Sequence, residues 1–182
     1  MMEPLSVALN AIDVSPFRLG CKTAVLGPGP IGLLTMLLLR AGGASFVMVT
    51  GASADRKRLQ VAEELGADIV LNVENDDPVA VSEKATNGGF DIIYEATGNS
   101  TVVSQALNML KPGGRLIMIG IHAQTVEFDP TPMVRNRRSI ISSYGFTPQT
   151  WVRGLNLLES GRLDVEPLIT HRLPLTEAEE AF

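Results

Sequence analysis

A glycine-rich stretch near the N-terminus has the residue types and spacing to bind phosphate groups. Gly27, Gly29 and Gly32 form the pattern G-x-G-x-x-G between two apolar runs, Thr23–Leu26 and Ile31–Arg40. In such a turn the first glycine lets the chain bend, the second lets a pyrophosphate approach the backbone, and the third lets a helix pack close to a strand. The N–H groups and the positive dipole end of that helix attract phosphate. Dinucleotide binding is therefore the first functional expectation.

The same glycine spacing also occurs in plain turns of α/β proteins, so its context decides its value. Here an expected strand, the turn and an expected helix follow one another directly. Pro30 suits the first helical turn, where a missing N–H costs little. We therefore interpret the stretch as a dinucleotide-binding turn rather than a plain one.

Strand-like and helix-like segments alternate along most of the chain. Strands are expected at Thr23–Leu26, Phe46–Thr50, Ile69–Leu71, Asp91–Glu95, Arg115–Ile119 and Ser139–Ser142. Helices are expected at Glu3–Val14, Ile31–Arg40, Ala54–Leu65, Pro78–Thr86 and Thr101–Leu110. The strands are mostly continuous apolar runs, which indicates a parallel sheet buried on both faces. The sequence therefore predicts an α/β fold with a doubly wound parallel sheet of Rossmann type.

Ligands of a doubly wound sheet bind beyond the carboxyl ends of its strands. The candidate coenzyme-binding residues are therefore those of the glycine turn and those near the ends of the later strands. They are Gly27, Gly29, Pro30, Ile31, Gly32, Gly51, Ser53, Arg56, Ala96, Thr97, Gly120, Ile121, Ile141 and Ser142.

The end of the second strand departs from the pattern that is typical of NAD. An NAD site usually has Asp or Glu there, which binds the ribose 2′-hydroxyl. This chain has Gly51, followed by Ser53 and Arg56, which can donate to a 2′-phosphate. An ordinary solvated helical turn would contain similar residues. The missing carboxylate and the nearby positive charge favour NADP over NAD, since nothing at that point repels a 2′-phosphate or binds the ribose diol.

Two further side chains near the strand ends could take part in chemistry. His122 follows the fifth strand and could relay a proton near the nicotinamide. No carboxylate partner is apparent for it, so we interpret it as a half-exposed loop histidine. Glu95 ends the fourth strand, and could be a buried, hydrogen-bonded carboxylate or a neighbour of the cofactor.

The composition sets limits on the class of protein. With 182 residues, 45% hydrophobic and 19% charged, the chain has ordinary globular composition and the length of about one domain. The net charge of −5 and the lack of a basic stripe disfavour nucleic acid as a partner. The longest apolar run is too short to span a membrane, which is therefore not an expected partner. The single cysteine, Cys21, excludes an internal disulfide and a cysteine-rich zinc site, and favours the cytoplasm.

Both ends of the chain read as pieces of an adjoining domain. Leu168–Leu175 is expected to be a strand that leaves the domain, and Thr176–Phe182 starts a helix that is marginal at this length. We expect residues 1–20 to lead in from a catalytic domain, residues 21–165 to bind the dinucleotide, and residues 166–182 to return to the catalytic domain. Thr125–Asp129 alternates polar and apolar residues and is expected to be an exposed edge strand.

Six blocks of the sequence resemble the coenzyme-binding domain of the zinc-type medium-chain dehydrogenase/reductase family, in its polyol and threonine dehydrogenase branch. They occur in the family's order and with its spacing. The blocks are EPLSVALNA (3–11), GPGPIG (27–32), AEELGAD (62–68), DIIYEATG (91–98), LKPGGRLIMIG (110–120) and PLITHRLPL (167–175).

The resemblance implies hydride transfer between NAD(P) and an alcohol or polyol, with a catalytic zinc. In the family most zinc ligands come from an N-terminal domain that this chain lacks, and Glu3 matches a glutamate at or near the metal. We therefore expect zinc in the full-length protein, no tight zinc site in this chain, and no catalysis by this chain alone. The resemblance also implies a homodimer, or a tetramer, joined through the region of Thr125–Asp129.

Two other functions stay open. One is a regulatory module that binds a dinucleotide without chemistry, which the fold alone does not exclude. The other is an enzyme with an adenosyl ligand, such as a methyltransferase, which also uses a glycine turn. The compact GPGPIG turn, followed directly by an apolar helix, favours a pyrophosphate over the adenosyl ligand.

Overall fold

The computed structural model describes residues 1–181, which contain a six-stranded sheet in the order β3-β2-β1-β4-β5-β6. All neighbouring strands are parallel. The strands are β1 (Lys22–Leu26), β2 (Phe46–Gly51), β3 (Ile69–Asn72), β4 (Phe90–Glu95), β5 (Leu110–Met118) and β6 (Ser139–Ser142). The expected doubly wound α/β fold is confirmed, and its strand order reverses between β1 and β4, where such sheets bind ligands.

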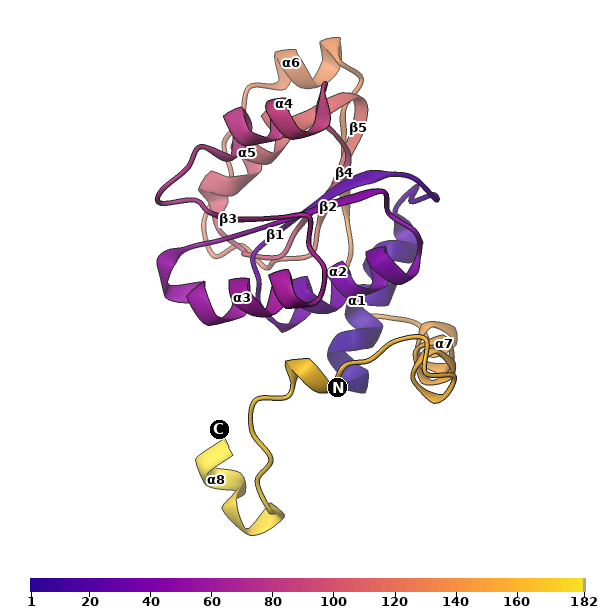
Figure 1. Ribbon diagram of the computed structural model, residues 1–182. Coiled ribbons are helices and arrows are strands. Elements are labelled where there is room, and N and C mark those ends of the chain that lie inside the picture. Colours follow the sequence, from indigo (N-terminus) through magenta and orange to yellow (C-terminus); the bar gives the residue numbers. More distant parts are fainter. Residues whose placement is uncertain (182) are drawn as a thin grey trace.

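Helices cover both faces of the sheet, as Figure 1 shows. One face carries α1 (Met2–Val14), α2 (Pro30–Ala41) and α3 (Arg56–Glu64), and the other carries α4 (Pro78–Thr86) and α5 (Ser100–Met109). Within β1, Val25 packs into the core under α2, whereas Ala24 and Leu26 pack into the core under α5. Burial on both faces explains why the central strands are mostly continuous apolar runs rather than alternating ones.

The helix starts differ in a way that matters for the site. In α4 and α5 the capping residues Asp77 and Asn99 accept hydrogen bonds from the N–H groups of the second helical residues. The helix α2 begins instead after Gly29, which has no side chain to accept such a bond. The first N–H groups of α2 therefore remain available to a ligand.

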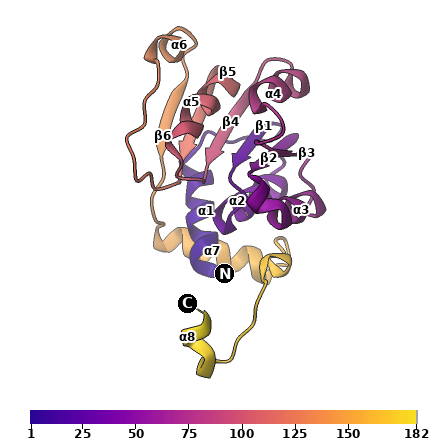
Figure 2. The ribbon, with the colours of Figure 1, turned by 90° about the vertical axis from the view of Figure 1, so that its left-hand side faces the viewer.

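Two helices, α6 (Pro130–Arg135) and α7 (Pro148–Glu159), are absent from the sequence-based expectation. The helix α7 packs against α1, and Leu163 joins α1 and α2 in a third apolar cluster. Figure 2 shows α7 below the sheet, next to α1. Short helical turns complete the fold: η1 (Ser53–Asp55), η2 (Glu166–Leu168), η3 (Leu175–Glu177) and α8 (Ala178–Ala181).

The expectation of strands at Thr125–Asp129 and Leu168–Leu175 is wrong, because neither segment joins the sheet. The first segment runs along α5, where the Ser104 hydroxyl donates to the Glu127 carbonyl oxygen (2.8 Å) and Val126 packs into the core. The alternation of polar and apolar residues in Thr125–Asp129 therefore reflects packing against the helix α5. The free edges of the sheet are β3 and β6.

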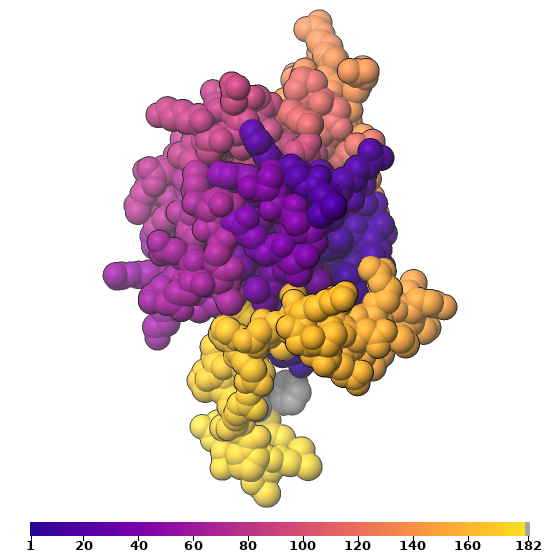
Figure 3. All heavy atoms as spheres, turned by 45° about the vertical axis from the view of Figure 1, so that its right-hand side comes forward, coloured from indigo at the N-terminus to yellow at the C-terminus, as the bar shows by residue number. Residues whose placement is uncertain are grey.

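The C-terminal segment follows α7 and extends away from the body of the molecule, as Figure 3 shows. Prolines within it lack the N–H that a strand would need. The expected helix at Thr176–Phe182 is present as η3 and α8, and Phe182 lies outside the described residues. None of the helices in the described part of the chain has the length and apolar character needed to cross a membrane.

Candidate functional site

The glycine turn between β1 and α2 uses its three glycines in different ways. Gly27 has a φ of +99°, a backbone region that favours glycine. A Cβ on Gly32 would lie 1.9 Å from the Gly27 carbonyl oxygen, so a side chain there would push the helix off the strand. A Cβ on Gly29 would meet no atom within 4 Å. Packing inside the protein therefore requires Gly27 and Gly32, while Gly29 borders open space.

The N-terminus of α2 faces the same open space. Pro30 occupies the first turn, and the Leu33 N–H is taken by the Gly29 carbonyl oxygen over 2.9 Å. The N–H groups of Ile31 and Gly32 precede it and have no carbonyl partner within the helix. Together with the positive end of the helix dipole they can receive a negatively charged oxygen.

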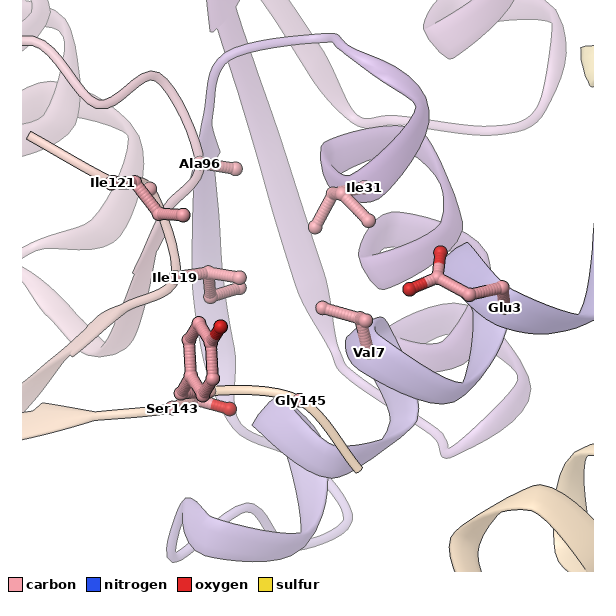
Figure 4. A pocket seen from close by; sticks show the side chains of 10 residues that line it. Glu3, Val7, Ile31, Ala96, Ile119, Ile121, Ser143 and Gly145 are labelled. Carbon is pink, nitrogen blue, oxygen red and sulfur yellow. The ribbon is translucent and has the colours of Figure 1, made fainter. Parts of the chain in front are cut away.

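A mainly apolar cavity of about 490 Å³ lies at the carboxyl ends of the central strands. Figure 4 shows Ile31 and Val7 on one side of it and Ile119 and Ile121 on the other. Its lining residues are Glu3, Val7, Ile31, Ala96, Ile119, Gly120, Ile121, Ser143, Tyr144 and Gly145. A flat ring with an apolar face fits such a cavity better than a charged group does.

The cavity contains some of the residues expected from the sequence and lacks others. Ile31, Ala96, Gly120 and Ile121 line it, and Glu3 borders it. Ile141 and Ser142 do not line it, since the chain turns in only after β6, at Ser143. Thr97 lies beside the glycine turn instead, with its Cγ2 atom 2.8 Å from where a Cβ of Gly27 would stand.

Glu95 and His122 form a buried pair next to this cavity. Glu95 is fully buried, and its Oε1 accepts hydrogen bonds from the N–H groups of Thr97 (2.6 Å) and Gly98 (3.0 Å). Its Oε2 lies 3.0 Å from Nε2 of His122, whose side chain is 9% exposed. The interpretation of His122 as half-exposed and without a carboxylate partner is therefore wrong. The interpretation of Glu95 as a buried, hydrogen-bonded carboxylate is confirmed.

The pair links two loops that reach the cavity. Oε2 of Glu95 faces Nε2 of His122, and Nδ1 of His122 has no partner among the described residues. The turn after β4 supplies Ala96 to the cavity, and the loop after β5 supplies Ile121. The sequence contained one signal for the pairing of Glu95 with His122: both residues follow or end strands that become neighbours in the parallel sheet.

At the end of β2, Gly51 packs against the glycine turn. A Cβ there would lie 2.8 Å from Cγ of Pro28 and 3.1 Å from Cδ2 of Leu59. The Pro28 ring thus occupies the space where the side chain of an Asp or Glu at position 51 would begin. The absence of a carboxylate from this strand end therefore has a structural cause.

The side chains that follow Gly51 carry charges of both signs. Ser53 and Arg56 are exposed, and Arg56 makes no salt bridge within residues 1–181, whereas Arg58 pairs with Asp55 at 3.1 Å. Glu74, from the loop after β3, places Oε2 3.3 Å from the Ser53 nitrogen. The expectation that no carboxylate lies near this point is therefore wrong, since the loop after β3 supplies one.

Glu3 is the acidic residue that the sequence indicated for a metal. It is exposed in the first turn of α1, and Figure 4 shows its carboxylate directed toward the cavity. Residues 1–181 contain no group of three or more His, Cys, Asp or Glu side chains that could hold a metal ion. Glu3 alone does not make a zinc site, which needs about three or four protein ligands.

Comparison with known proteins gives a consistent family. The family profile described as "Zinc-binding dehydrogenase" matches residues 30–160. Sorbitol dehydrogenase from Gallus gallus is 34% identical over 185 residues, which cover 100% of this chain and 51% of that protein.

Two solved structures extend the similarity to three dimensions. The crystal structure of 2R,3R-butanediol dehydrogenase from Bacillus subtilis has a TM-score of 0.91 and 33% identity, over 99% of this chain and 51% of that one. A putative zinc-binding dehydrogenase from Sinorhizobium meliloti 1021, bound to NADP, has a TM-score of 0.88 and 29% identity, over 99% of this chain and 53% of that one.

The chain thus spans about half the length of the relatives that it matches. The resemblance drawn from six sequence blocks is confirmed, because the profile match extends over more than half of the 182 residues. On this evidence the chain belongs to the zinc-binding dehydrogenase family.

Proposed function

We propose that this chain is the coenzyme-binding part of an NAD(P)-dependent alcohol or polyol dehydrogenase. The observation that carries the proposal is the glycine turn, in which Gly29 borders open space while Gly27 and Gly32 are required by packing. A turn that only shaped the fold would not need a glycine at the open position. A pyrophosphate that approaches the backbone there would need it.

The residues around the turn suggest how the dinucleotide lies. The pyrophosphate would receive hydrogen bonds from the N–H groups of Ile31 and Gly32, next to Thr97. The nicotinamide ring would occupy the apolar cavity between Ile31 and Ile121, with Ala96 and Gly120 at its wall. Ile141 and Ser142 would support the loop at Ser143 rather than touch the ring. The bound coenzyme supplies the hydride acceptor, and these residues position it and exclude water.

The substrate and the metal would depend on residues outside this chain. We propose that the whole protein oxidises an alcohol or polyol to a ketone, with zinc, and that Glu3 faces the metal from the coenzyme side. In this division residues 1–20 and 166–182 contact the catalytic domain, and residues 21–165 bind the coenzyme. The similarity to dehydrogenases about twice this length supports the division.

The first test is ligand-dependent thermal stability of the 182-residue chain. A ligand at about 100 times its Kd stabilises the native state by about 2.7 kcal/mol, which raises the Tm of a chain of this size by roughly 5–10 °C. We expect this shift with NADPH or NADH and none with S-adenosylmethionine. A shift with S-adenosylmethionine alone would indicate the methyltransferase alternative. Dehydrogenase assays of the full-length protein would separate an enzyme from a regulatory module.

We further propose a preference for NADP(H) over NAD(H). Gly51 supplies no carboxylate, and Arg56, which makes no salt bridge within residues 1–181, can form a charge-assisted hydrogen bond to a 2′-phosphate. Arg56→Ala should weaken NADPH binding by about tenfold or more and leave NADH binding nearly unchanged. Lys57→Ala is the matched control, because it removes a charge from the next position. Equal losses in both variants would indicate a general charge effect rather than a phosphate contact.

Two further proposals concern assembly and location. We propose a homodimer or tetramer, with the free edge at β6 rather than Thr125–Asp129 as the strand available for pairing. Sedimentation velocity at several concentrations would detect a dimer. A single cysteine is in keeping with a reducing compartment, for which we propose the cytoplasm.

A further inference from the structure

The loop after β3 is tied to the end of β2 by several hydrogen bonds. The Val73 N–H donates to the Gly51 carbonyl oxygen (3.0 Å). The Asn72 amide bridges the two segments, because Nδ2 donates to the Ser53 hydroxyl (2.9 Å) and Oδ1 accepts from the Glu74 N–H (3.1 Å). The backbone of Glu74 is therefore held at a fixed place beside Ser53.

The carboxylate of Glu74 is directed back across this junction. Its Oε2 accepts from the Ser53 N–H at 3.3 Å. Ser53 lies two residues beyond Gly51, the position whose side chain meets the adenosine ribose in related sheets. At Gly51 the Pro28 ring leaves no space for a carboxylate. Glu74 thus brings a negative charge to this region from the loop after β3.

We infer that Glu74 is a specificity-determining residue for the coenzyme, and that it opposes Arg56. This inference rests on the proposed function. The Glu74 carboxylate accepts hydrogen bonds from the ribose hydroxyls of NAD(H) and repels the 2′-phosphate of NADP(H), whereas Arg56 attracts that phosphate. Selectivity is the difference between two affinities, and a repulsive group contributes to it as much as an attractive one. Glu74 therefore keeps the preference for NADP(H) smaller than Arg56 alone would make it.

The test is a fluorescence titration of NADPH and NADH with the unmodified 182-residue chain and with Glu74→Gln. The amide keeps the size of the side chain and removes its charge. We expect Glu74→Gln to bind NADPH more tightly and NADH more weakly, so that the ratio of the two Kd values moves toward NADPH by about tenfold. The far-ultraviolet circular dichroism of the variant should match that of the unmodified chain, since Glu74 is exposed.

Asp76→Asn is the matched control. Asp76 is an exposed acid on the same loop and makes no hydrogen bond to the end of β2 through its side chain within residues 1–181. Its removal changes the net charge equally, so we expect a ratio within about twofold of that of the unmodified chain.

Two results would overturn the inference alone: an unchanged ratio in Glu74→Gln, or the same shift in both variants. Failure of the unmodified chain to bind either coenzyme would instead overturn the proposed function, and this inference with it. The unmodified chain could also bind NADH more tightly than NADPH while Glu74→Gln shifts the ratio of Kd values toward NADPH. That result would overturn the proposed preference for NADP(H) and support the role of Glu74.

Discussion

The two ends of the proposed dinucleotide site use different parts of the chain, backbone at one end and side chains at the other. The pyrophosphate end consists of backbone: Gly27 and Gly32 are fixed by φ and by packing, and the buried Glu95 carboxylate holds the adjacent turn through N–H groups. The adenosine end consists of exposed side chains, chiefly Arg56 and Glu74, on loops after β2 and β3.

Because of this difference, we expect one end to determine the stability of the fold and the other to determine the choice of coenzyme. Changes at the pyrophosphate end remove packing or leave buried polar groups without partners, so they should lower stability first. Changes at the adenosine end alter exposed charges, which contribute little to stability, so they should alter the choice of coenzyme first. Four predictions follow from this contrast, from the largest expected effect to the smallest.

Glu95→Leu should have the largest effect. It removes the acceptor for the Thr97 and Gly98 N–H groups and leaves His122 buried beside an apolar side chain. A buried donor left without an acceptor costs about 1–3 kcal/mol, so the loss of several acceptors should lower the Tm by roughly 10 °C for a chain of this size. Glu74→Gln is the comparison and should change the Tm by less than about 2 °C. Equal effects of the two variants on Tm would contradict the claim that the pyrophosphate end contributes more to stability than the adenosine end.

Gly32→Ala should come next. The new Cβ would lie 1.9 Å from the Gly27 carbonyl oxygen, a backbone atom that cannot move without shifting β1 or α2. Overpacking of this kind costs about 1–3 kcal/mol, occasionally more. Urea unfolding measures the loss as a lower midpoint at constant m-value. A variant as stable as the unmodified chain would show that the close approach of helix and strand is not needed.

Gly51→Asp should act on both stability and coenzyme choice, because its Cβ would lie only 2.8 Å from Cγ of Pro28. Alone, the substitution should destabilise the chain by about 1–3 kcal/mol. Combined with Pro28→Ala it should recover most of that loss and shift the ratio of Kd values toward NADH by about tenfold. The double variant tests coenzyme choice without the clash. A double variant that keeps the NADPH preference would contradict the assignment of Gly51.

The contrast also explains what the sequence could predict. The glycine turn and the alternation of strands and helices depend on local spacing and on apolar runs, which are visible in the chain itself. The contacts of Glu95 with His122, and of Glu74 with Ser53, join residues 27 and 21 positions apart. They depend on which strands become neighbours and on how each loop returns, and spacing does not specify this.

The missed and misassigned elements have related causes. The helices α6 and α7 begin with proline after a capping residue, a signal that the sequence does contain. Thr125–Asp129 shows the alternation of a strand but packs along α5. A period of two indicates one buried face, and it does not reveal whether a sheet or a helix covers that face.

The central claim is that the glycine turn binds a pyrophosphate, and Gly29→Ala tests it most directly. A Cβ at Gly29 meets no protein atom within 4 Å, so the variant should keep its Tm within about 2 °C of the unmodified chain. The same Cβ would stand where the pyrophosphate approaches, so calorimetric titration should show NADPH binding weakened by at least about tenfold. A stable Gly29→Ala chain that binds NADPH as tightly as the unmodified chain would contradict the account.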